Sequence, residues 1–400
     1  MLVFILNAGS SSLKYQLMNP LTKEVFAVGL CERIGIDGVL KHEFGENKIT
    51  LNVAMPTHKE AIELVLRTLT SGEGKVIDSV EDIDAIGHRA VHGGEEFASS
   101  VMVTDKVIAK MKELIPLAPL HNPANIMGME ICAELMPGKP NVAVFDTAFH
   151  QTMPDYAYMY ALPKEMYSKH GIRKYGFHGT SHYFVSNEAK GMLDKKHNTR
   201  VIVCHLGNGS SVSAVLNGKC IDTSMGLTPV QGLMMGTRAG DVGAGAISYM
   251  MSKENLTIDQ ALDVMNKKSG ILGISGKSSD LREVLQGMQD GDDSCRLAVD
   301  MVAYNIKKYV GAYVAALDGV DALCFTGGIG ENAALIREKV CAGLDSMGLV
   351  IDPVKNNKRS SKARDIATNA SASRIFVIPT NEEFVIANDT YRIVSELNNK

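Results

Sequence analysis

Two short polar segments rich in glycine and serine, one in each half of the chain, could bind an anion. The first is Asn7–Ser12, which follows the apolar run Leu2–Leu6 and leads to Lys14. The second is His205–Ser211, which follows the apolar run Val201–Cys204. Small residues let the backbone approach an anion closely, and successive backbone N–H groups can bind it. One such segment could be an ordinary surface hairpin, but its recurrence predicts a duplicated domain with a phosphate-binding loop in each half.

Cationic and acidic side chains gather at the ends of further predicted strands. Gly87–Gly94 contains two histidines and an arginine, and Asp146 directly follows a short apolar strand. Gly176–His182 places two histidines before a predicted helix, and Arg238 lies in the glycine-rich segment Gly226–Gly245. Open α/β sheets bind ligands beyond the carboxyl ends of their strands, so Gly87–Gly94 and Asp146 predict functional strand ends. Gly176–His182 is predicted to be a loop before a helix, and Gly226–Gly245 is not expected to form regular structure. For each segment taken alone, a loop of satisfied polar side chains is the alternative.

Predicted strands and helices must position these side chains. A capping box and an apolar stripe predict a helix over Thr57–Thr70, and a second stripe predicts a helix over Asp292–Leu317 that packs on the core. Ala322–Phe325 predicts a strand, and Thr326–Asn332 predicts a glycine turn before a helix over Ala333–Leu344. A strand, a glycine turn and a helix in this order form an arrangement that can accept a nucleotide.

Length and composition exclude several classes of protein. The chain has 400 residues, more than one hydrophobic core usually organises, so two domains are expected. Its formal net charge of −4 does not favour a nucleic-acid partner, and no apolar run is long enough to span a membrane. The seven scattered cysteines predict buried thiols in a reducing cytoplasm, and no spacing typical of zinc ligands occurs. A cytoplasmic location is therefore expected.

Eight motifs in order resemble the acetokinase family, within the superfamily of acetate and sugar kinases, Hsp70 and actin. They span essentially the whole chain and read NAGSSSLKY, GHRAVHGG, PLHNP, VFDTAFHQTMP, YGFHGTSH, HLGNGSSVSA, DTSMGLTPVQGLMMGTRAGD and FTGGIGEN. The resemblance implies an α/β protein with the two-domain, duplicated ribonuclease-H-like fold of actin-like ATPases and an interdomain nucleotide cleft. It implies an N-terminal acyl-substrate and phosphate domain of residues 1–148 plus 384–400, with a returning C-terminal helix. Residues 149–383 would form a nucleotide-binding and dimerisation domain, and the protein would be a homodimer.

The resemblance also implies roles for individual residues. Asn7 and Glu382 would hold Mg²⁺, with Mn²⁺ as an alternative metal, and Arg89 would bind the acyl substrate. Asp146 corresponds to the residue usually described as a proton donor or acceptor. The residues that would stabilise the transition state are His178 and Arg238. The small acyl pocket would be lined by Val91, Leu120, Phe177 and Pro229. The residues around ATP or ADP would be Lys14, His205, Leu206, Gly207, Asn208, Gly209, Asp280, Leu281, Arg282, Gly328, Ile329, Gly330, Glu331 and Asn332.

The chemistry implied by this resemblance is reversible, direct in-line transfer of a phosphoryl group from ATP to acetate, giving acetyl phosphate and ADP. A carboxylate substrate has a pKa near that of Glu, roughly 4.3, so it is ionised at neutral pH and needs no general base. The difficulty is to bring one anion onto another, which calls for arginine, histidine, a metal and backbone N–H groups. Asp146 is therefore expected to orient an arginine or the metal shell more than to move a proton.

Several alternatives stay open. Propionate or butyrate could be the acceptor, because one methylene changes discrimination by only about 1–3 kcal/mol, and pyrophosphate could be the donor. An actin-like or Hsp70-like ATPase switch is a rival from another class, and a sugar kinase is a weaker one. One departure from the family pattern also stands out. Where the family commonly has Asp-Pro after the arginine motif and one aliphatic residue, this chain has Gly243-Ala244, followed by Gly245, and the two glycines are expected to loosen the start of the following segment.

Overall fold

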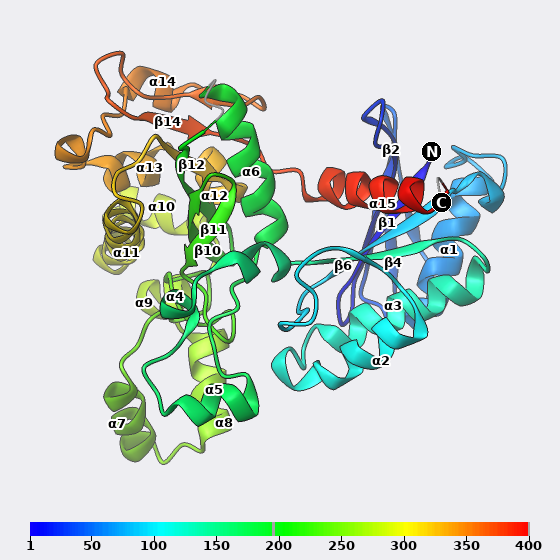
Figure 1. Ribbon diagram of the computed structural model, residues 1–400, viewed down its shortest axis with the longest axis horizontal. Helices are drawn as coiled ribbons and strands as arrows, with labels where there is room; N and C mark the ends of the chain where they lie inside the picture. Colours follow the sequence, from blue (N-terminus) through cyan, green and yellow to red (C-terminus); the bar gives the residue numbers. More distant parts are fainter. Residues whose placement is uncertain (194–196, 399–400) are drawn as a thin grey trace. The chain divides into compact units, whose positions relative to one another are not determined.

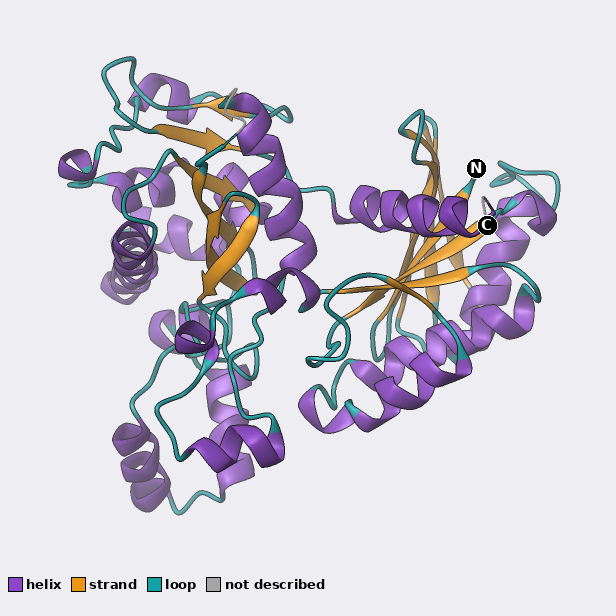
Figure 2. Ribbon diagram, viewed as in Figure 1, coloured by secondary structure: helices purple, strands orange, loops and turns teal. Residues whose placement is uncertain are grey.

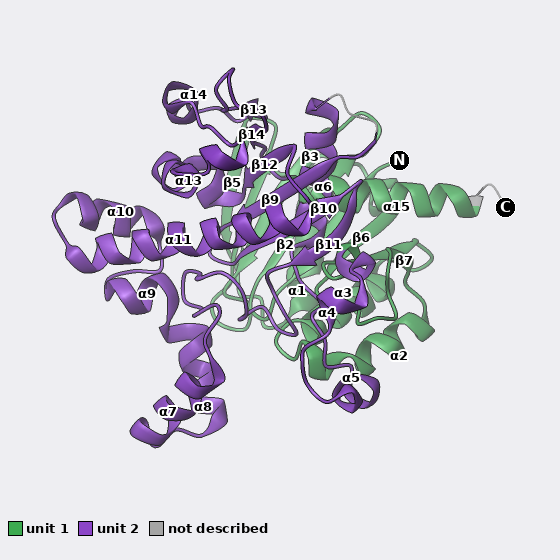
Figure 3. Cartoon of the chain, turned by 60° about the vertical axis from the view of Figure 1, so that its left-hand side comes forward, with its two compact units in different colours: residues 1–149, 381–400 green, residues 150–380 purple. Residues whose placement is uncertain are grey.

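The computed structural model of the chain consists of two compact units, each built around its own β-sheet. The structure describes residues 1–193 and 197–398. Unit 1 comprises Met1–Phe149 and Asn381–Lys400, and unit 2 comprises His150–Thr380 (Figure 3). Glu382, which the sequence-based boundary placed in the second domain, therefore belongs to the first unit.

Unit 1 contains an eight-stranded sheet in the order β5-β4-β3-β2-β1-β6-β8-β7. Strands β1 to β5 pair in antiparallel fashion, β1, β6 and β8 run parallel, and β7 is antiparallel to β8. The strands are β1 (Val3–Ala8), β2 (Leu13–Asn19), β3 (Glu24–Glu32), β4 (Val39–Phe44), β5 (Asn47–Asn52), β6 (Ala85–Ala90), β7 (Val101–Met102) and β8 (Asn141–Phe145).

Alternate residues of the central strand of unit 1 face two different helical layers. Phe4 and Leu6 pack in a core with residues of α1 and α3, whereas Val3 and Ile5 pack with residues of α15. Figure 1 accordingly shows α15 across the sheet from α1, α2 and α3. The helices are α1 (His58–Thr70), α2 (Asp105–Glu113), α3 (Asn122–Leu135) and α15 (Glu382–Asn398). The predicted capping box of α1 is confirmed, because Thr57 and Glu60 each accept from the other's backbone N–H.

Unit 2 contains a six-stranded sheet in the order β11-β10-β9-β12-β14-β13. Strands β9, β10 and β11 are antiparallel neighbours, β9, β12 and β14 run parallel, and β13 is antiparallel to β14. The strands are β9 (Arg200–Leu206), β10 (Ser210–Leu216), β11 (Lys219–Thr223), β12 (Ala322–Thr326), β13 (Arg364–Asp365) and β14 (Arg374–Val377). This pattern repeats β3-β2-β1-β6-β8-β7 of unit 1 in order and direction, so the predicted duplication is confirmed.

The helices of unit 2 lie on both faces of its sheet (Figure 2). The long helix α11 packs with the inward residues of β9 and β10 in one large core, and α6 packs against β9 and β12 on the other side of the sheet (Figure 1). The helices are α4 (Asp155–Tyr158), α5 (Lys164–His170), α6 (Gly179–Met192), α7 (Ala244–Glu254), α8 (Ile258–Asp263), α9 (Gly270–Ser275), α10 (Leu281–Gln289), α11 (Asp293–Ala316), α12 (Gly327–Asn332), α13 (Ala334–Cys341) and α14 (Pro353–Asn357).

The glycine segment after β12 differs from its prediction. Gly327–Asn332 forms the short helix α12 instead of a turn. Gly327 has a φ of 76°, and this left-handed residue turns the chain directly from the strand into the helix. The side chain of Asn332 then donates to the carbonyl oxygen of Gly328 at 2.9 Å within the helix. Such a short helix is not predicted from a glycine-rich sequence, because glycine has a low intrinsic helix propensity.

Two further expectations concern the cysteines and the membrane. All seven cysteines are free and buried, as predicted. Within residues 1–193 and 197–398, every helix is too short or too polar to cross a bilayer.

Candidate active site

The β1–β2 tip of unit 1 is held in one conformation by backbone and side-chain hydrogen bonds. Gly9 N–H donates to the carbonyl oxygen of Ser12 at 2.8 Å, and a ring nitrogen of His58 donates to the carbonyl oxygen of Gly9 at 2.7 Å. Below the tip, Asn7 and Lys14 are direct cross-strand partners. Their side chains therefore project from the same face of the sheet.

Arg89 and Asp146 meet because β6 and β8 are parallel neighbours. Arg89 lies in β6, and Asp146 follows the end of β8. The guanidinium donates from Nε to Asp146 Oδ1 at 3.0 Å and from Nη2 to Oδ2 at 2.7 Å. Asp146 is only 2% exposed, and its negative charge raises the pKa of Arg89 above the usual range. A two-pronged pair of this kind fixes the plane of the guanidinium.

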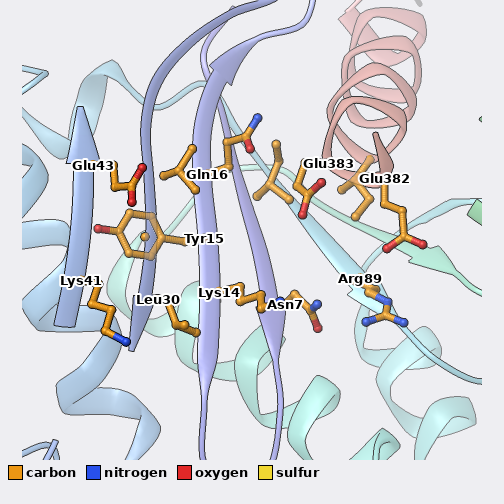
Figure 4. Close-up of a pocket in the computed structure, with 14 residues that line it drawn as sticks. Asn7, Lys14, Tyr15, Gln16, Leu30, Lys41, Glu43, Arg89, Glu382 and Glu383 are labelled. Carbon is orange, nitrogen blue, oxygen red and sulfur yellow. The ribbon is translucent and has the colours of Figure 1, made fainter. Parts of the chain in front are cut away.

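A cavity of about 330 Å³ in unit 1 gathers four of the predicted site residues (Figure 4). Asn7, Lys14, Arg89 and Glu382 all line it, and Glu382 is the first residue of α15. Burial raises the pKa of Glu382 to about 7, although the nearby Arg89 acts in the opposite direction. The hairpin strands β1 and β2, the distant strand β6 and the start of α15 thus place two cations, an amide and a carboxylate around one cavity.

The donor set of this cavity fits a magnesium ion. Asn7 offers an amide oxygen, and Glu382 offers carboxylate oxygens whose burial is unfavourable even though Arg89 and Lys14 lie nearby. Mg²⁺ keeps several water ligands and takes few protein oxygens, so two such residues are enough. In the described part of the chain, no three His, Cys, Asp or Glu side chains form a metal-binding group. The set therefore suits a hard cation that retains water.

The two acyl-pocket residues predicted in unit 1 are placed differently. Val91 is 6% exposed just beyond β6, and its N–H donates to the side chain of Asn125 at 3.0 Å. Leu120 is 73% exposed, and neither of the two residues is among those that line the cavity. Unit 1 by itself therefore brings Val91 close to Arg89 in the chain but leaves Leu120 at the surface.

In unit 2, a chain of hydrogen bonds leads from the half-buried His178 to fully buried side chains. His178 precedes α6 in the left-handed conformation, with a φ of 59°. Its Nδ1 lies 2.9 Å from Ser211 Oγ, and the same hydroxyl lies 2.7 Å from Nε2 of the buried His182. His182 Nδ1 then contacts Ser213 Oγ at 2.8 Å. Burial and the neighbouring histidines lower the pKa of His182, so this ring is neutral at pH 7.

His178 and Arg238 converge on the β9–β10 tip. A methyl group built on Gly209 would lie 3.4 Å from His178 Nε2 and 3.5 Å from Arg238 Nη1. The ring of His178 also stacks on that of His205, with centroids 4.3 Å apart. Burial lowers the pKa of Arg238 without removing its charge at neutral pH. Both predicted transition-state residues thus point at the polar loop of unit 2.

The remaining predicted nucleotide residues lie around the same loop. The N–H of Gly236 donates to the carbonyl oxygen of Asn208 at 3.0 Å, and Gly236 also approaches the backbone of Ser279. Asp280 caps α10, and hydrogen bonds from Arg282 lower its pKa to about 2. The side chains of Leu206 and Leu281 are buried in the core, so only their backbone can face a ligand.

The helix α12 adjoins this loop because β12 pairs with β9. The side chain of Glu331 accepts from Gly327 N–H at 3.0 Å, and Ile329 packs against the core. Arg337 lies almost fully buried behind the helix and donates to the carbonyl oxygens of Gly330 and Glu331 at 2.8 and 3.0 Å. A buried guanidinium thus satisfies the carbonyl end of α12.

Two acyl-pocket residues belong to unit 2. Phe177 is 3% exposed, and its carbonyl oxygen accepts from a ring nitrogen of His150 at 2.9 Å. Pro229 is half-buried in the segment that leads to Arg238.

Several residues that hold the site together were not predicted from the sequence, among them Ser211 and Arg337. Ser211 lies in a motif that was recognised, whereas no local pattern around Arg337 indicates its link to α12.

Known proteins resemble this chain over nearly its full length. The family model described as the acetokinase family matches residues 2–388. Acetate kinase of Agathobacter rectalis is 53% identical over 394 residues, which cover 98% of this chain and 99% of that protein. Acetate kinase of Methanosarcina thermophila is 51% identical over 397 residues, with 98% and 97% covered.

Solved structures are equally similar. The crystal structure of Porphyromonas gingivalis acetate kinase superimposes with a TM-score of 0.95 at 49% identity, covering 98% of this chain and 99% of that chain. That of a propionate kinase from Francisella tularensis gives a TM-score of 0.92 at 43% identity, with the same coverage of 98% and 99%. The predicted actin-like ATPase type of fold is thereby confirmed. This chain belongs to the acetokinase family.

Proposed function

We propose that this chain is a phosphotransferase that moves a phosphoryl group from ATP to acetate, giving acetyl phosphate and ADP in a reversible reaction. Membership of the acetokinase family supports the reaction class. The observation that carries the proposal is the Arg89–Asp146 pair, whose arginine lines the same cavity as Asn7 and Glu382. A fixed guanidinium for a carboxylate thus lies beside oxygen ligands for a metal.

Arg89 is the residue proposed to bind the acyl substrate. Asp146 uses Nε and Nη2 of Arg89, which leaves Nη1 to face a carboxylate. Acetate is ionised at neutral pH, so the attacking oxygen needs no base. Asp146 therefore acts by orienting Arg89. The proposed acyl pocket consists of Val91, Leu120, Phe177 and Pro229.

The transferring phosphoryl group is proposed to meet His178 and Arg238. A carboxylate oxygen of acetate forms a bond to the γ-phosphorus while the bond from this phosphorus to the bridging oxygen breaks, and ADP leaves. Arg238 and a ring N–H of His178 would stabilise the equatorial oxygens, where charge concentrates in the transition state. Mg²⁺, held by Asn7 and Glu382, would neutralise charge on the phosphates.

The nucleotide is proposed to bind at the loops around β9 and β12. The residues concerned are Lys14, His205, Leu206, Gly207, Asn208, Gly209, Asp280, Leu281, Arg282, Gly328, Ile329, Gly330, Glu331 and Asn332. For the residues of unit 2, the contacts through Gly236 and along the β9–β12 pair support a common role. Lys14 is the one member of the set in unit 1, where it lies in β2 and lines the cavity.

The protein is further proposed to be a cytoplasmic homodimer. Its buried free thiols suit a reducing compartment. Helix α7 has no buried residue, and its Tyr249 is 66% exposed. On α8, Ile258 is 55% exposed and Leu262 is 44% exposed. Large apolar side chains on a projecting helix suit an interface with a second copy. Light scattering during gel filtration would give the mass, and a monomer would contradict the dimer.

The experiment that tests the activity is acyl phosphate formation from Mg-ATP, trapped with hydroxylamine, with acetate, propionate and butyrate in parallel. Acetate turnover above that of the longer acids is expected. Faster turnover of propionate would move the specificity toward that of the Francisella relative, which is named a propionate kinase. ATP hydrolysis without any acyl phosphate would overturn the proposal in favour of an ATPase switch. A parallel run with pyrophosphate tests the donor.

The metal site has its own test. Asn7→Ala and Glu382→Gln should each raise the Mg²⁺ concentration for half-maximal activity by about tenfold, because each removes one of few protein ligands. An unchanged magnesium dependence in both variants would contradict the assignment. Gln16→Ala serves as a control, since Gln16 lines the same cavity without being a proposed ligand.

A further inference from the structure

The segment that carries Arg238 is hydrogen-bonded at both ends to one helix. Met234 N–H donates to the side-chain oxygen of Asn305 at 2.8 Å, and Tyr309 O–H donates to Asp241 Oδ2 at 2.5 Å. Asn305 and Tyr309 are four residues apart on α11, so they occupy neighbouring positions on one helix face. Helix α11 thus contacts the segment on either side of Arg238.

The same segment is closed into a ring at its base. Asp241 Oδ1 accepts from Gly232 N–H at 3.1 Å, and Asp241 N–H donates to the carbonyl oxygen of Gly232 at 2.9 Å. Gly232 has a φ of 106°, and a methyl group there would lie 2.6 Å from the carbonyl oxygen of Ser224. This closure therefore requires glycine. One carboxylate oxygen of Asp241 thus closes the ring by accepting from Gly232, and the other accepts from Tyr309 of α11.

The tyrosine is suited to a permanent donor role. Burial and the hydrogen bond to Asp241 raise the pKa of Tyr309, so its hydroxyl keeps its proton at neutral pH. Its ring packs edge-on against that of Tyr313, with centroids 5.8 Å apart. The aromatic ring of Tyr309 is thus held by packing, and its hydroxyl alone contacts the segment, through the hydrogen bond to Asp241.

Beyond Asp241 the chain loses such support. Methyl groups built on Gly243 or Gly245 would meet no atom within 4 Å, and α7 begins without a side-chain cap. Gly243 and Gly245, which depart from the family pattern, therefore follow Asp241, the residue that is hydrogen-bonded to α11. Any motion of α7 is separated from Arg238 by the contact between Asp241 and α11.

We propose that Asn305 and Tyr309 are positioning residues that hold Arg238 at the β9–β10 tip. The inference rests on the role proposed above for Arg238 in the transition state. No substrate contact is proposed for the two α11 side chains. They act by fixing the backbone on either side of the arginine, so that its Nη1 stays beside Gly209.

The first test is Tyr309→Phe, which keeps the ring and removes only the hydroxyl. We expect kcat to fall about tenfold, the effect of losing one hydrogen bond to a carboxylate, with KM for ATP and acetate changed by less than about twofold. Asn305→Ala should give the same division between kcat and KM. Tyr304→Phe is the matched control, because Tyr304 is on the same helix but 66% exposed beneath Lys308.

The second test combines Tyr309→Phe with Arg238→Ala. If Tyr309 acts through Arg238, the double variant should be no slower than Arg238→Ala alone, because no guanidinium remains to be positioned. A double variant about tenfold slower than Arg238→Ala would show a general structural effect and overturn the inference. Thermal melting of each variant reports whether the fold is kept.

The two proposals can fail separately. Full activity of Tyr309→Phe and Asn305→Ala, with Arg238→Ala impaired, would overturn the positioning role alone. Full activity of Arg238→Ala would overturn the role of Arg238 and the positioning role with it. A loss in Tyr304→Phe equal to that in Tyr309→Phe would also overturn the inference.

Discussion

Both carboxylate oxygens of Asp146 accept a hydrogen bond from the guanidinium of Arg89, at 3.0 Å from Nε and 2.7 Å from Nη2. The aspartate is 2% exposed, so the carboxylate is shielded from water, whereas the Arg89 side chain remains partly exposed. A carboxylate engaged at both oxygens is suited to orienting its partner, and less suited to exchanging a proton with a substrate. The geometry therefore favours a positioning role for Asp146.

Asp146→Asn tests this role. An amide offers Arg89 one acceptor and turns an N–H₂ group toward a second donor, so the guanidinium should lose its fixed plane. We expect kcat/KM for acetate to fall about 10- to 100-fold, with the pH dependence of the rate unchanged. A changed pH profile would indicate proton transfer instead. A variant with most of its activity and a normal profile would contradict both roles.

Ser211→Ala removes the hydroxyl that lies 2.9 Å from His178 Nδ1, and it should therefore disturb the position of the His178 ring. Ser211 Oγ lies within hydrogen-bond distance of both His178 Nδ1 and His182 Nε2, so its loss affects two rings at once. We expect kcat to fall about tenfold while KM for ATP changes little. Ser213→Ala is the control, because Ser213 contacts His182 and not His178. Equal losses in the two variants would argue against a specific effect on His178.

A pair of glycine substitutions flanks Arg238. A methyl group on Gly236 would lie 1.8 Å from Asn208 Oδ1, whereas one on Gly245 would meet open space in the first turn of α7. Gly236→Ala should therefore displace Asn208 and raise KM for ATP about tenfold. Gly245→Ala should leave activity unchanged and stabilise the protein by about 0.5–1 kcal/mol in urea unfolding. Lower activity in Gly245→Ala would mean that the looseness of this segment has a function.

Local patterns predicted the parts of the site that lie within one element. The alternation around Asn7–Ser12 predicted the β1–β2 hairpin, and the capping box predicted the start of α1. Pairing between strands distant in sequence could not be predicted in this way. The contact of Arg89 with Asp146 depends on β6 and β8 being neighbours, which no periodicity encodes. The motif resemblance supplied their common site, but not the bond between them.

The stripe of α11 shows a second limit of sequence patterns. Its spacing predicts core packing, and Tyr313 is indeed buried there. Tyr309 shares the stripe, yet its hydroxyl reaches Asp241 in a segment about 70 residues away. Periodicity describes which face of a helix is apolar, and it carries no information about the polar tip of an amphipathic side chain. The partner of such a tip is set by the tertiary fold.

Histidines buried in a neutral form should make the stability of unit 1 depend on pH. His88 is 2% exposed, and burial lowers its pKa to about 4 from an ordinary value near 6.5. Its Nε2–H donates to the side-chain oxygen of Asn141 at 2.7 Å, a bond that the neutral ring can make. Between pH 6.5 and pH 4, His88 is protonated in the unfolded chain and stays neutral in the folded chain. The free energy of unfolding should therefore fall as the pH drops from 6.5 to 4, by about 3 kcal/mol for this residue.

His88→Gln isolates the contribution, because glutamine can donate to Asn141 and does not titrate. Urea unfolding at pH 7.5 and at pH 5, followed for both proteins, should show a smaller loss of stability in the variant. Part of the slope should remain, since burial also lowers the pKa of His92 to about 4. Equal slopes in the two proteins would mean that His88 takes up a proton in the folded state. In that case the ring and Asn141 must rearrange in acid, because an uncompensated imidazolium buried at this position would be strongly unfavourable.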